Sequence, residues 1–194
     1  LLFLAPWEEW SLSDRLAHLA FASLAFWMAA LWPLSLIGLP LHWFCHGVTV
    51  LTLAAYAWLA LGRGVPVRVR FQARDVVVLA VMGLVLYLRL RPLSVAPAPS
   101  GADMSMHAYI AQLLVDAAGV PDSYHPLLGL DRFAAFPVGF HTIAAIFSLL
   151  GGHPAWWSTF VMGCLSHALF CLGLYVLVRD MAGWREGLVA AVAA

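Results

Sequence analysis

Long runs of apolar residues, separated by short polar stretches, make up most of this chain. A helix needs about 20 mostly apolar residues to cross a bilayer. The pattern therefore predicts an all-α, polytopic bundle of transmembrane helices. The predicted spans are residues 14–38, 41–62, 75–91, 136–151 and 155–178, with another span beginning near residue 187. Ser13 and Asp14 are expected to cap the first span, and Gly38 and Pro40 to separate it from the second.

Composition agrees with a membrane protein. Hydrophobic residues make up 63% of the 194 positions and charged residues 10%, whereas a soluble domain carries about 25% charged residues. Ten basic residues balance ten acidic ones, so no basic excess points to a nucleic-acid partner. The first and last segments, LLFLAP and EGLVAAVAA, both look like interrupted spans. We therefore expect this sequence to be an N-terminal fragment of a larger polytopic protein.

The distribution of charge between the predicted spans indicates an orientation. The connection 63–74 holds Arg63, Arg68, Arg70 and Arg74, whereas the connection 92–135 holds four Asp and one Arg. Because Arg-rich loops stay on the cytoplasmic side, the connection 92–135 is expected to lie outside. We expect an integral, multi-pass protein of a bacterial or archaeal cytoplasmic membrane.

The connection 92–135 contains a predicted amphipathic helix over residues 104–118. Its apolar residues recur at helical spacing and form one face, consisting of Met106, Tyr109, Ile110, Leu113 and Leu114. Gly119 and Pro121 follow as expected end signals. Such a helix is typical of a juxtamembrane segment that lies on the bilayer surface. Asp103 is expected at its N-cap.

Asp103 and His107 form the first candidate site. Asp103 has two interpretations, either a helix cap or an ionised carboxylate that serves as a general base or metal ligand. His107 lies four residues later, so the two side chains share a helix face. Tyr124 and His125 are either plain turn residues or part of the same site. His141 falls within a predicted span, where a histidine is costly unless it meets a partner or a cavity.

Arg89 and Arg91 stand at the outer end of the third predicted span. They are interpreted either as arginines that reach toward lipid headgroups or as ligands of a phosphate, whose shape suits a guanidinium.

The segment Ala102–Ala111, the Gly119-Val120-Pro121 stop and the re-entry Phe136–His141 together resemble the GT-C superfamily of integral-membrane glycosyltransferases. Members use lipid-linked sugar donors, and an acidic residue opens their first large extracytoplasmic loop. The resemblance implies that Asp103 is the catalytic base or a metal-organising acid. Met104 stands where the family often has a second carboxylate, so a divalent metal, with Asp103 and His107 as ligands, is left open.

The resemblance implies transfer of a sugar from a polyprenyl phosphate to an acceptor at the outer face of the bilayer. Tyr124, His125 and His141 would help to bind the substrates together with His107. Arg89, Arg91 or Arg132 would stabilise the phosphate that leaves. Two other interpretations stay open, a polytopic transporter or lipid flippase and a non-catalytic membrane subunit.

Overall fold

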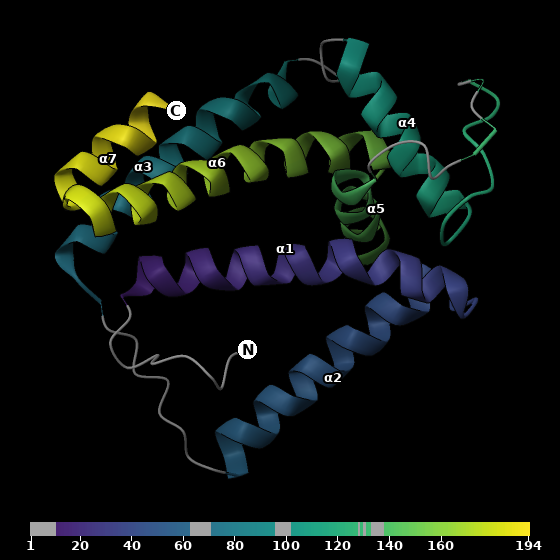
Figure 1. The fold of residues 1–194 in the computed structure, drawn as a ribbon, viewed down its shortest axis with the longest axis horizontal. Coiled ribbons are helices and arrows are strands. Elements are labelled where there is room, and N and C mark those ends of the chain that lie inside the picture. The colour runs from purple at the N-terminus through teal and green to yellow at the C-terminus, as the bar shows by residue number, and fades with distance from the viewer. Residues whose placement is uncertain (1–10, 63–70, 96–101, 128, 130, 133–137) are drawn as a thin grey trace. The chain divides into compact units, whose positions relative to one another are not determined.

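The computed structural model describes residues 11–62, 71–95, 102–127, 129, 131–132 and 138–194. This part of the chain is helical and contains no β-strand (Figure 1). The elements are α1 (Leu12–Leu36), α2 (Leu41–Gly62), α3 (Ala73–Leu90), the 3-10 turn η1 (Arg91–Ser94), α4 (Ala102–Asp116), α5 (Gly139–Gly151), α6 (Ala155–Ala182) and α7 (Trp184–Ala193). The predicted all-α class is confirmed.

Two of these helical segments are long and apolar enough to cross a membrane. They are α3 together with η1, residues Ala73–Ser94, and α6, residues Ala155–Ala182. By contrast, α5 has 13 residues and is about 20 Å long, which is shorter than the ~30 Å hydrocarbon layer. The span predicted at 136–151 is thus a short helix in the described part of the chain. Residues 136 and 137 lie outside the described residues.

The start of α1 differs from the predicted Ser13-Asp14 cap. The helix begins at Leu12, and Ser11 is the residue that caps it. The backbone N–H of Ser11 donates to Asp14 Oδ2 at 3.1 Å, and the N–H of Asp14 donates to Ser11 Oγ at 3.4 Å. This reciprocal pair is a capping box, in which the acidic residue stands three positions after the cap.

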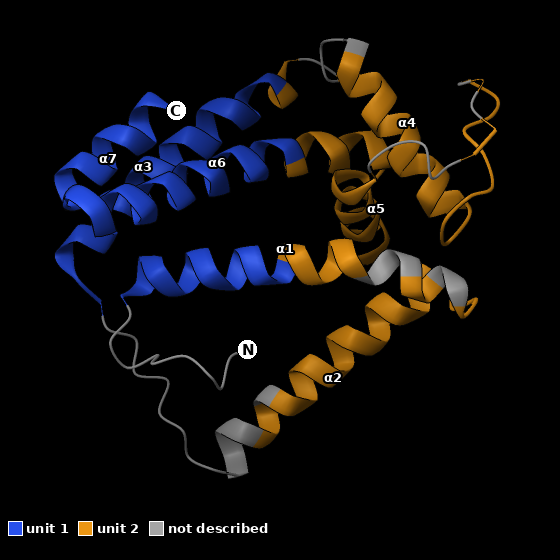
Figure 2. Cartoon of the chain, viewed as in Figure 1, with its two compact units in different colours: residues 1–23, 66–92, 163–194 blue, residues 24–65, 93–162 orange. Residues whose placement is uncertain are grey.

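The chain divides into two compact units (Figure 2). Unit 1 comprises residues 1–23, 66–92 and 163–194, and unit 2 comprises residues 24–65 and 93–162. Unit 1 therefore holds the first part of α1, all of α3, the second part of α6 and all of α7.

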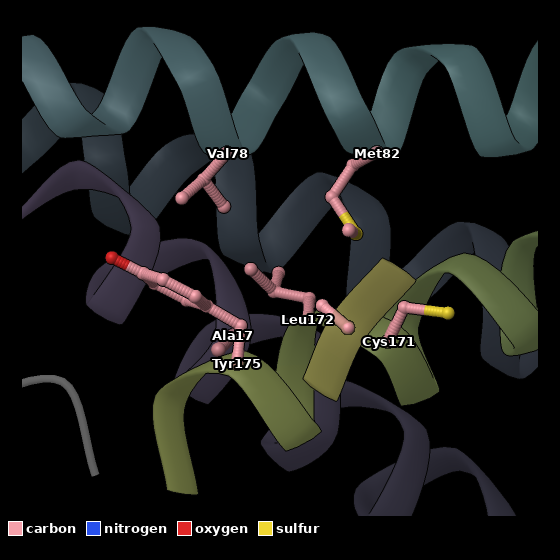
Figure 3. Close-up of a cluster of buried hydrophobic side chains, with 7 residues drawn as sticks. Ala17, Val78, Met82, Cys171, Leu172 and Tyr175 are labelled. Atoms are coloured by element: carbon pink, nitrogen blue, oxygen red, sulfur yellow. The ribbon is translucent and has the colours of Figure 1, made fainter. Parts of the chain in front are cut away.

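The core of unit 1 lies where these helices pack. Val78 and Met82 of α3 point toward Leu172 of α6 (Figure 3). The other buried members of this cluster are Ala17, Cys171, Tyr175 and Ala191. α7 crosses α6 closely, because a Cβ added at Gly187 would lie 2.7 Å from the backbone oxygen of Tyr175. Small residues allow such close approach between helices.

Unit 2 is built around α4 and α5. Ile110, Leu114 and Tyr124 are fully buried and cluster with Val138 and Ala145. A second cluster joins the end of α1, the start of α2 and α5, and consists of Leu34, Leu41, Cys45 and Ile146. The centre of the apolar face predicted for the helix at 104–118 is thus covered by protein.

The ends of α4 differ from the prediction by two residues. The helix covers residues 102–116, and the left-handed residue after it is Ala118, with φ of 51°, where Gly119 was expected. The carbonyl oxygen of Ala118 accepts the backbone N–H of Leu41 at 2.5 Å. This hydrogen bond ties the end of α4 to the start of α2 and holds Ala118 in a conformation that glycine adopts more easily.

Candidate functional site

A pair of histidines joins α4 to α5 in unit 2. His107 Nδ1 and His141 Nε2 lie 2.7 Å apart, and the two ring centroids are 4.9 Å apart. His141 is 2% exposed, whereas His107 is half-buried. The Phe140 ring also packs against His107 in a T-shaped arrangement, with ring centroids 5.8 Å apart.

The helical repeat of α4 explains why these rings meet. His107 precedes Ile110, Ala111 and Leu114 by three, four and seven residues, so all four lie on one side of the helix. The three apolar residues are fully buried, and Ile110 and Leu114 pack in the cluster that includes Ala145 of α5. The packing that buries this apolar stripe therefore turns His107 toward α5, where His141 lies.

The distance between the two nitrogens is that of a hydrogen bond with a shared proton. One imidazole donates and the other accepts in this hydrogen bond. Two ligands of one tetrahedral zinc ion, each about 2.05 Å from the metal, would stand roughly 3.3 Å apart. The pair is too close for that arrangement, and no group of three or more His, Cys, Asp or Glu among the described residues is placed to hold a metal.

Asp103 lies on the same side of α4, one turn before His107. It is the second residue of the helix and therefore belongs to its first turn instead of the predicted N-cap position. Its side chain is exposed. The stripe of α4 thus runs from an exposed carboxylate, through a half-buried imidazole, to a buried apolar core.

A loop after α4 is fastened to this helix by Tyr109. The Tyr109 hydroxyl donates to the backbone oxygen of Tyr124 at 2.8 Å and accepts the backbone N–H of Leu127 at 3.3 Å. The Tyr124 side chain is fully buried in the hydrophobic cluster, so it presents no surface to a substrate. His125 is exposed, and its Nε2 lies 3.0 Å from Asp131 Oδ1.

The arginines of the predicted phosphate site belong to different parts of the structure. Arg89 and Arg91 are exposed residues of unit 1, whereas the histidine pair and Asp103 are in unit 2. Arg132 is exposed as well. The structure therefore brings together His107 and His141 from the predicted set, and places Arg89 beside another residue, His167 of α6.

A buried polar cluster in unit 1 was missed from sequence. Arg179 Nη1 donates to Asp14 Oδ1 at 2.5 Å, and both side chains are largely buried. Nearby on α1, Ser13 Oγ donates to Asp75 Oδ1 at 2.7 Å, and Asp75 is fully buried. One signal in the sequence could have predicted this cluster. Single charged residues stand at the ends of three apolar segments, and charged residues that become buried are normally paired.

Comparison with protein-family models, with curated proteins and with solved structures found no match to this chain.

Proposed function

We propose that the protein is a multi-pass membrane glycosyltransferase of the GT-C type. It moves a sugar from a lipid-phosphate donor to an acceptor at the outer face of the bilayer, and Asp103 is its catalytic base. The resemblance of residues 102–111, 119–121 and 136–141 to that superfamily supports the activity. The two helical segments of transmembrane length support the location.

The observation that carries the proposal is the 2.7 Å hydrogen bond between His107 and His141 one turn from Asp103. This bond joins α4 to α5, so the exposed carboxylate stands on a helix that is held by a buried partner. A general base needs such a fixed position, because a misplacement of about 1 Å costs catalysis heavily. His107 and His141 are positioning residues in this proposal.

The reaction follows from the roles of these groups. Asp103 takes the proton of the acceptor hydroxyl. The acceptor oxygen then forms a bond to the anomeric carbon, and the bond from that carbon to the phosphate oxygen breaks. The bonding electron pair leaves with the lipid phosphate, so one displacement inverts the anomeric configuration without a covalent enzyme intermediate. Because the described donor set does not form a metal site, no step is assigned to a metal.

The test compares two exposed carboxylates of one helix. Asp103→Asn removes the proposed base, and Asp116→Asn changes an exposed carboxylate at the other end of α4 that accepts a hydrogen bond from Gln112. Sugar transfer is measured in membranes with radiolabelled polyprenyl-phosphate sugars, with and without a chelator. We expect Asp103→Asn to lower transfer by at least about 100-fold and Asp116→Asn to retain it, at equal membrane insertion.

Equal transfer by both variants would refute the role of Asp103. A second measurement addresses the activity itself. If the wild-type chain transfers no sugar from any donor but moves labelled lipid between the leaflets of a vesicle, the alternative of a lipid flippase replaces the proposal.

A further inference from the structure

We draw no further inference here: the strongest candidate, the N-terminus of α5 beside the His107–His141 pair, which no side chain of the described residues caps, carries nothing because no second feature of the described residues points to a ligand there and the pair already belongs to the candidate site.

Discussion

Loss of the ion pair between Asp14 and Arg179 should destabilise unit 1 by an amount that can be measured as a coupling energy. The pair joins α1 to α6 with an N–O distance of 2.5 Å, and its side chains are 13% and 12% exposed. Two unit charges about 4 Å apart attract by roughly 4 kcal/mol at an effective dielectric constant of about 20. Each partner keeps other contacts, because Arg179 Nη2 also pairs with Asp180 at 2.6 Å and Ser11 Oγ donates to Asp14 at 2.8 Å.

These remaining contacts reduce the expected effect. They lower the cost of leaving either charge alone, so we expect a coupling energy of about 2 kcal/mol between the two positions. The assay is a double-mutant cycle of Asp14→Asn, Arg179→Gln and the double variant, with the free energy of unfolding measured in mixed micelles. Each single variant should lose about 3 kcal/mol, and the double variant should lose less than the sum.

The control is Arg185→Gln, since Arg185 is exposed, and a substitution there should change the free energy of unfolding by no more than about 0.5 kcal/mol. A coupling energy below about 0.5 kcal/mol would refute the reasoning, because the two side chains would then contribute independently. A loss of similar size in the control would show that the protein's free energy of unfolding in micelles falls with the removal of any charge.

Three further predictions concern packing and backbone. Leu114→Ala removes a fully buried side chain between α4 and α5 and should cost about 3 kcal/mol of unfolding free energy; a cost below 1 kcal/mol would contradict the described core. Gly187→Ala places a Cβ 2.7 Å from a backbone oxygen of α6, so it should lower the thermal midpoint, and an unchanged or higher midpoint would refute the close approach. Ala118→Gly relieves a φ of 51° and should add roughly 1 kcal/mol to the free energy of unfolding, and a loss of stability would refute the strain at this residue. Tyr109→Phe removes the hydroxyl that binds the loop at 124 and 127, and amide hydrogen exchange at Leu127 should rise roughly fivefold, in line with about 1 kcal/mol for one hydrogen bond; unchanged exchange would show that the loop is held by other contacts.

The helices themselves were largely predictable, because apolar run length and end signals are local properties. The boundaries predicted at 41–62 coincide with those of the helix α2, and the spans at 75–91 and 155–178 agree with α3 and α6 to within four residues at either end. Of these three, α6 and α3 with η1 are long and apolar enough to cross a membrane. What failed locally was the choice of capping residue, since Ser11 and Ser13 offer the same hydroxyl to α1 and only the distances select Ser11.

The contact between two residues of the predicted set, His107 and His141, could not be predicted from the sequence. Helical periodicity placed Asp103 and His107 on one face. It grouped Ile110 and Leu114 on an apolar face expected to lie on the bilayer, whereas in the structure both are buried against protein. It gave no partner for His107, because the His141 ring lies 34 positions later on another helix. Tyr124 was interpreted as either a turn residue or part of the site, and the structure shows its ring buried in the core of unit 2.

The sequence by itself therefore determined the helical class and the two segments of the described chain, α3 with η1 and α6, that are long and apolar enough to cross a membrane. These follow from backbone hydrogen bonding and hydrophobic periodicity, which act over a few residues. Only the tertiary structure decided that His107 meets His141, that Arg179 pairs with Asp14 and that Arg89 lies beside His167. Such pairs depend on which helix faces pack together, and that packing is set by the burial of apolar surface far apart in the chain.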